Sequence, residues 1–122
     1  MEKFLKALKE RAAFFLAEME QFEPFGVYIS LKGEILDIKR PSEPRSIEES
    51  YDFLLKHFNK DLSSDEVMAY AIVLNGHVDG KDSIVVEIFV PRQDKYQAVF
   101  PYTIKGEIVI FGEDTNLKYH TN

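Results

Sequence analysis

The run from Val67 to Phe111 constrains the fold of this chain more than any other segment. It contains four stretches rich in apolar and β-branched residues, and short turn sequences separate them. Asp79-Gly80, the segment 91–95 and Lys105-Gly106 have the composition of tight turns between strands. The run therefore predicts a four-stranded antiparallel meander over residues 66–112.

The expected register of this meander sorts its side chains onto two faces. If Asp79-Gly80 is the first turn, Val73 pairs with Val86, and the second turn then places Val86 beside Phe100. One face is almost wholly apolar and is the expected core: Ala69, Ala71, Val73, Val86, Ile88, Val90, Ala98, Phe100, Tyr102, Val109 and Phe111. The other face mixes apolar and polar residues: Tyr70, Ile72, Leu74, Val85, Glu87, Phe89, Gln97, Val99, Pro101, Thr103, Ile108 and Ile110.

Glu87 is the one charge inside the apolar strand 83–90. In this register its neighbours are Ile72 and Val99, and neither can neutralise a carboxylate. Burial of a lone charge is costly, so we expect Glu87 either to recruit a partner or to lie at the rim of the sheet. No placed nucleophile, oxyanion donor or metal ligand accompanies it, so the sequence assigns no catalytic residue.

The rest of the chain supplies two helices and a hairpin. Apolar residues recur at three- and four-residue spacing before Pro24, and Ser46 with Glu49 forms a capping box before a second helical pattern. The predicted segments within one domain of residues 1–122 are an N-terminal helix (1–23), a hairpin (24–39), a second helix (46–60), the meander (66–112) and a loose tail (113–122). This order, αββα followed by a four-stranded meander, predicts an α+β fold in which one mainly antiparallel sheet packs against two helices. Profilin-like and roadblock-like domains share much of this order.

Composition excludes several classes of function. The net charge of −6 argues against electrostatic capture of nucleic acid or of an anionic membrane. The chain has no cysteine, which removes disulfides, thiolate nucleophiles and cysteine-based zinc sites. No segment has the apolar length of a signal peptide or of a membrane span. We therefore expect a cytoplasmic protein that binds neither nucleic acid nor membrane.

The segment from Asn75 to Asp82 places oxygen and nitrogen groups at alternate positions, as in the first half of a calcium loop. The pattern fails at its twelfth position, where Val86 stands in place of the required glutamate. An Asp-Gly hairpin explains the same residues without a metal. We therefore expect no metal site, and no phosphate-binding loop or other cofactor motif is present.

The mixed face is too apolar to be open to water, and three interpretations explain it. A helix or the N-terminal hairpin covers it, a second protein chain covers it, or it lines a small-molecule pocket around Glu87. We expect a non-enzymatic protein-binding domain, either self-associating as a homodimer or engaging a foreign partner; the alternative is a ligand-binding or enzymatic domain. The candidate partner-binding residues are Tyr70, Ile72, Glu87, Phe89, Val99, Ile110 and the off-stripe Phe14.

Short segments across most of the chain resemble a group of small bacterial α+β proteins without an established activity. The shared segments are Phe22-Glu23-Pro24-Phe25-Gly26 at the start of a hairpin, Asp82-Ser83-Ile84 at the start of the strand with Glu87, and Pro101-Tyr102 before Gly106-Glu107. The resemblance implies a stand-alone domain that works by binding, as some immunity partners of toxins do. An acidic surface would steer a basic partner such as a toxin domain.

Overall fold

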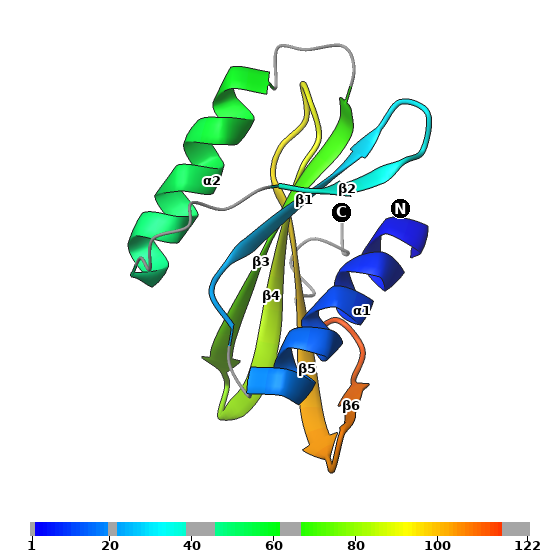
Figure 1. The fold of residues 1–122 in the computed structure, drawn as a ribbon, viewed down its shortest axis with the longest axis vertical. Helices are drawn as coiled ribbons and strands as arrows, with labels where there is room; N and C mark the ends of the chain where they lie inside the picture. The colour runs from blue at the N-terminus through cyan, green and yellow to red at the C-terminus, as the bar shows by residue number, and fades with distance from the viewer. Residues whose placement is uncertain (1, 20–21, 39–45, 62–66, 116–122) are drawn as a thin grey trace.

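A computed structural model gives the fold, and it describes residues 2–19, 22–38, 46–61 and 67–115. The protein is α+β, with two helices and a curled antiparallel sheet of six strands (Figure 1). The elements in chain order are α1 (Glu2–Met19), β1 (Phe25–Ser30), β2 (Ile35–Asp37), α2 (Ile47–Asp61), β3 (Val67–Val78), β4 (Lys81–Phe89), β5 (Tyr96–Lys105) and β6 (Ile108–Phe111).

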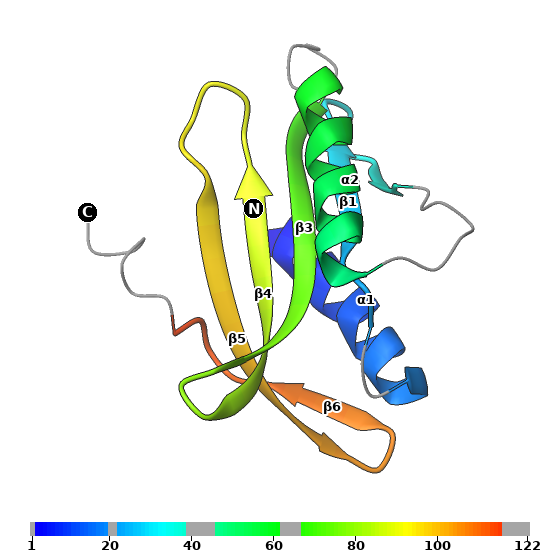
Figure 2. The same cartoon turned by 90° about the vertical axis from the view of Figure 1, so that its left-hand side faces the viewer.

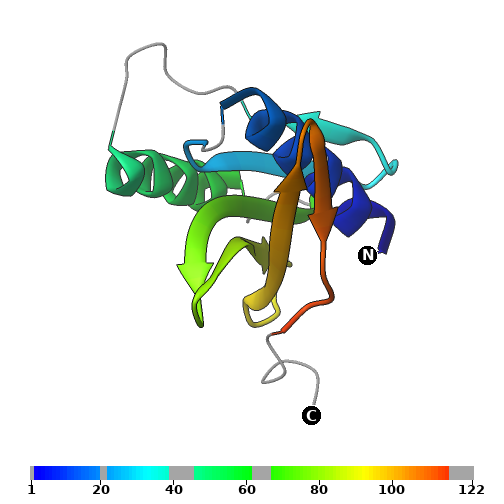
Figure 3. The same ribbon diagram turned by 90° about the horizontal axis from the view of Figure 1, so that it is seen from below.

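The strand order across the sheet is β2-β1-β3-β4-β5-β6. Sequence analysis left this order open, because nothing in the local pattern says which edge of the meander receives the first hairpin. In the structure β1 pairs antiparallel with β3, so the N-terminal hairpin extends the meander at its β3 edge. The sheet curls strongly, as the view from below shows (Figure 3).

One face of the sheet packs against α1 and holds the larger core. The helix contributes one buried residue per turn, Phe4, Leu8, Ala12 and Leu16, which is the spacing of a single apolar stripe. The buried strand residues of this core are Phe25, Val27, Ala69, Ala71, Val73, Ile84, Val86, Ile88, Ala98 and Phe100. The predicted core face is thus the face that α1 covers.

The mixed face is covered by α2, which packs over β1 and β3 (Figure 2). Leu54 and Phe58 of the helix are fully buried against Tyr70 and Ile72 of β3. Gly26 allows the close approach, since a Cβ atom there would lie 2.7 Å from Cδ2 of Leu54. The first of the three interpretations of this face, a covering helix, therefore applies to its part over β1, β3 and β4.

The register is as predicted in one hairpin and wrong in the next. Val73 pairs with Val86 across the Asp79-Gly80 turn, in which both residues have positive φ (52° and 80°), the conformation of a type I′ turn. Val86, however, pairs with Ala98 rather than with Phe100. The error is two residues, so each side chain keeps its predicted face.

Local signals at the ends of elements have mixed outcomes. The cap of α2 is confirmed, since the backbone N–H of Glu49 donates to Oγ of Ser46 at 3.1 Å. The start of the predicted tail is fixed rather than loose, because Thr115 donates its backbone N–H to the carbonyl of Val99 at 2.8 Å. Met19 and Ile47, two apolar residues of the helical patterns, are mostly exposed. Residues 116–122 and the proline-containing connector 39–45 lie outside the described residues.

Candidate functional site

The sheet splits at the end that carries the turns of the β3–β4 and β5–β6 hairpins. The ladder between β4 and β5 ends at the pair Ser83 and Pro101, although both strands continue beyond it. From there the β3–β4 hairpin and the β5–β6 hairpin diverge, which is plain in the side view (Figure 2). We call this region, Lys81 and Asp82 of β4 together with Tyr102–Ile104 of β5, the split end.

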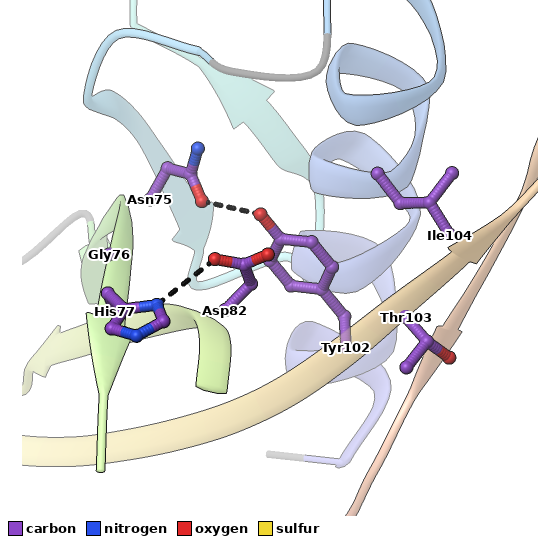
Figure 4. A pocket seen from close by; sticks show the side chains of 7 residues that line it. All are labelled: Asn75, Gly76, His77, Asp82, Tyr102, Thr103 and Ile104. Atoms are coloured by element: carbon purple, nitrogen blue, oxygen red, sulfur yellow. Dashed lines mark hydrogen bonds and ion pairs between the residues drawn. The ribbon is translucent and has the colours of Figure 1, made fainter. Parts of the chain in front are cut away.

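A polar hollow of about 880 Å³ opens at the split end (Figure 4). It is lined by Asn75, Gly76, His77, Asp82, Tyr102, Thr103 and Ile104. The hydroxyl of Tyr102 donates to Oδ1 of Asn75 at 2.9 Å, so a β5 residue bonds across to β3. Nδ1 of His77 lies 3.2 Å from Oδ1 of Asp82 and, as the protonated nitrogen, donates to that carboxylate. The hollow therefore has two ordered polar pairs, one at its inner wall and one at its rim.

Tyr102 makes both a hydrogen bond and an aromatic contact in this hollow. Burial raises its pKa above the ordinary tyrosine value, and the nearby negative charge of Asp82 raises it further, whereas the hydrogen bond to Asn75 lowers it. The ring also meets Phe111 edge-on, with centroids 6.2 Å apart. Tyr102 is thus a fixed neutral phenol beside a carboxylate.

A second, more apolar hollow of about 520 Å³ adjoins the first at the split end. Its lining includes Pro101, Thr103 and Ile110, and it shares Asp82 and Tyr102 with the polar hollow. Three large apolar side chains of the β5–β6 hairpin are exposed: Ile104 (39%), which lines the polar hollow, Ile110 (47%), which lines the apolar hollow, and Ile108 (66%) near the turn. The hairpin therefore presents apolar surface to solvent on both of its faces.

The predicted partner-binding residues lie in different environments, and their role in binding stays a prediction. Tyr70 and Ile72 are fully buried under α2 and form no exposed surface, and Phe89 is partly buried against the same cluster. Val99 is buried as well, and Asp114 accepts its backbone N–H at 2.8 Å.

Two further candidates are exposed and lie on different elements. Ile110 is on β6 beside the apolar hollow, whereas Phe14 is on α1 and is 64% exposed. Of the whole predicted set, only Ile110 therefore lines one of the two hollows described above.

Glu87 is buried, and the alternative of a rim position is wrong. Its side chain is 7% exposed, and its neighbour on β5 is Gln97 rather than Val99. Tyr51 of α2 donates its hydroxyl to Oε1 at 2.5 Å, and Nζ of Lys95 lies 3.2 Å from Oε2. The carboxylate thus recruits two partners that the strand register did not predict, because Tyr51 comes from α2 and Lys95 from the turn just before β5.

The carboxylate of Glu87 also affects the pKa of the Tyr51 hydroxyl. Burial raises its pKa, and the hydrogen bond and the charge of Glu87 raise it further, with a smaller effect from Asp52. The phenol therefore stays protonated and acts as a hydrogen-bond donor that fastens α2 to β4.

The Asn75–Asp82 segment forms the β3–β4 hairpin. His77 bonds to Asp82, Asn75 accepts from Tyr102, and Asp79 sits in the turn. Among the residues that the structure describes, no group of three or more His, Asp and Glu side chains could hold a metal ion. Within the same residues, no helix is long and apolar enough to cross a membrane.

The polar hollow was not predicted from the sequence, although four of its seven lining residues lie in the segment Asn75–Asp82 that the sequence pattern singles out. Asn75, His77 and Asp82 were interpreted together as a turn, and Tyr102 was assigned to the core face. The available signal was the polar residues at alternate positions 75 and 77, with Asp82 as the cross-strand partner of His77, on the face that is otherwise apolar. What the sequence does not show is that β5 separates from β4 beyond Pro101. Comparison of the chain with protein families, with curated proteins and with solved structures found no match.

Proposed function

We propose that this protein is a protein-binding domain whose contact surface is the β5–β6 hairpin with the hollows at the split end. The observation that carries the proposal is the exposure of Ile104, Ile108 and Ile110 on one short hairpin. Exposed apolar groups that cluster beside concave surface are typical of interaction sites. A cytoplasmic location belongs to the same proposal.

The partner that the charges favour is a foreign protein with a basic segment. The chain carries a net charge of −6, which repels a second copy and attracts a cationic partner. An acidic side chain, Asp82, lines both hollows. An immunity-like role against a basic toxin domain is one form that this proposal takes.

The earlier alternative, a ligand pocket centred on Glu87, has less support. Both carboxylate oxygens already have a partner, Tyr51 at one and Lys95 at the other. A ligand there would have to displace α2, whose Leu54 is fully buried against the sheet.

The proposal is tested by selecting random dodecapeptides from a display library on the wild-type protein. Counter-selection uses the double variant Ile108→Ser/Ile110→Ser, and the matched control is Leu31→Ser/Leu36→Ser, which removes two exposed leucines at the other edge of the sheet. We expect peptides rich in Arg, Lys and apolar residues that bind the wild type and the control but not the Ile variant. Selected peptides that bind the Ile108→Ser/Ile110→Ser variant as well as they bind the wild type would contradict the proposed surface.

Light scattering on the same proteins tests the choice of partner. We expect the wild type to be monomeric at all concentrations. A dimer that the Ile108→Ser/Ile110→Ser variant dissociates would replace the foreign basic partner with a second copy of this chain.

A further inference from the structure

We propose that the polar hollow at the split end receives the guanidinium group of an arginine from the partner. The inference rests on the proposed function and names the side chain that the surface recognises. Its structural basis is the pairing of one carboxylate, Asp82, with one fixed aromatic ring, Tyr102, in the same concave site (Figure 4).

The hollow offers acceptors to a group that only donates hydrogen bonds. His77 is bonded to Oδ1 of Asp82, which leaves Oδ2 without a partner among the described residues. The hydroxyl of Tyr102 uses its proton on Asn75, so its oxygen lone pairs face an incoming donor. A guanidinium carries five N–H donors in a plane and pairs with a carboxylate through two parallel hydrogen bonds.

The same hollow also has the walls that a planar cation requires. The ring of Tyr102 is half-buried and held by Phe111, and Ile104 lines the hollow beside it. Arginine stacks its flat cationic group on an aromatic face and lays its methylene chain along apolar surface. A lysine ammonium would meet the carboxylate as a point charge but would gain little from the plane of the ring.

The charges around the hollow favour a cation over other small groups. Asp82 is the carboxylate of the lining, and its negative charge contributes to the raised pKa of Tyr102. An anion would be repelled by it. Lys81, the nearest cation along the strand, belongs to the apolar hollow and is not part of the polar lining. The neighbour of Asp82, His77, orients the carboxylate through its Nδ1–H.

The test is a titration of the ¹⁵N-labelled full chain with Nα-acetyl-arginine amide, followed by amide chemical shifts. The reference probe is Nα-acetyl-citrulline amide, which has the same shape without the charge. We expect arginine amide to bind with millimolar affinity and to shift amides of residues 75–82 and 101–105. Citrulline amide should bind about tenfold more weakly or not at all. Equal shifts from the two probes, or no shift from arginine amide, would overturn the inference.

Two pairs of variants identify the residues that act. Asp82→Asn should weaken the binding of arginine amide about tenfold. Asp79→Asn, which removes an equal charge in the adjacent turn, should change the affinity little. Tyr102→Phe should retain most of the affinity because the ring remains, and Tyr102→Leu should lose it. Equal effects of the two Asp variants would mean that the acidic surface as a whole, and not this hollow, attracts the cation.

The outcome is separable from that of the proposed function. Selected peptides that lack arginine and bind Asp82→Asn as well as the wild type would overturn the guanidinium site and leave the hairpin surface standing. The opposite result is binding of arginine amide at Asp82 together with selected peptides that bind the Ile108→Ser/Ile110→Ser variant as well as the wild type. It would leave the guanidinium site standing and overturn the hairpin surface.

Discussion

Replacement of Tyr51 by Phe removes a single oxygen atom from the contact between α2 and the sheet. The lost hydroxyl donates to Oε1 of Glu87 at 2.5 Å, and the Glu87 side chain is only 7% exposed, so water reaches that oxygen poorly. A hydrogen bond to a charged group contributes about 1.5–3 kcal/mol, and an orphaned buried acceptor costs a similar amount. We therefore expect Tyr51→Phe to lower the free energy of unfolding by roughly 2 kcal/mol.

The second partner of Glu87 should matter less. Lys95 is 41% exposed, and a partly solvated ion pair is worth about 0–1 kcal/mol. Lys95→Met should therefore destabilise the protein by less than about 1 kcal/mol. In a Glu87→Gln background the charge is gone, so Tyr51→Phe should cost about 1 kcal/mol less than it does in the wild type.

The measurement is urea unfolding followed by far-ultraviolet circular dichroism, analysed as a double-mutant cycle over Tyr51 and Glu87. The control is Tyr28→Phe, the same change at a tyrosine whose hydroxyl has no hydrogen bond to the described residues. An effect of Tyr51→Phe no larger than that of the control, or a cycle with no coupling, would refute the argument from burial and hydrogen bonding.

Three further results follow from the structure. Ser46→Ala removes the N-cap of α2 and should cost about 1 kcal/mol in thermal or urea unfolding, with Ser42→Ala, four residues earlier, as the comparison. Gly80→Ala places a Cβ at φ of 80° and should cost about 1–2 kcal/mol; a neutral result would contradict the type I′ turn. Raised pKa values of Tyr51, Tyr96 and Tyr102 mean that the unfolded chain loses these protons first, so their contribution to stability is present below about pH 10 and is lost as the pH rises further. Unfolding measured from pH 8 to pH 11 should therefore show a decline that Tyr51→Phe makes shallower; an equally steep decline in the variant would contradict the raised pKa.

Much of the fold was predictable because its signals are local. An Asp-Gly pair fixes a two-residue turn, so Val73 and Val86 could be paired from the sequence alone. The β4–β5 connection has no such signal, and the length of its loop left Val86 free to be paired two positions away from its true partner, Ala98. The predicted faces were still correct, because side chains alternate between the two faces of a strand with a period of two.

The candidate site was less predictable because it depends on tertiary arrangement. No residue near Glu87 in the sequence indicates that Tyr51, on a helix 36 positions earlier, donates its hydroxyl to the Glu87 carboxylate. Nor does the composition of β5 reveal that the strand leaves β4 after Pro101, which is what opens the hollow at Tyr102. A pattern within one strand cannot report where two strands part.

The Glu87–Tyr51 pair has a consequence for how the central strands find their alignment. Both faces of β3 and β4 are apolar, so burial alone would tolerate a shift of one residue that exchanged the two faces. Such a shift would carry Glu87 into the core beneath α1, beside Ala71 of β3 and Ala98 of β5, where an uncompensated charge costs several kcal/mol. One buried acid, matched to one phenol on the opposite helix, thus discriminates against misaligned sheets that hydrophobicity would accept.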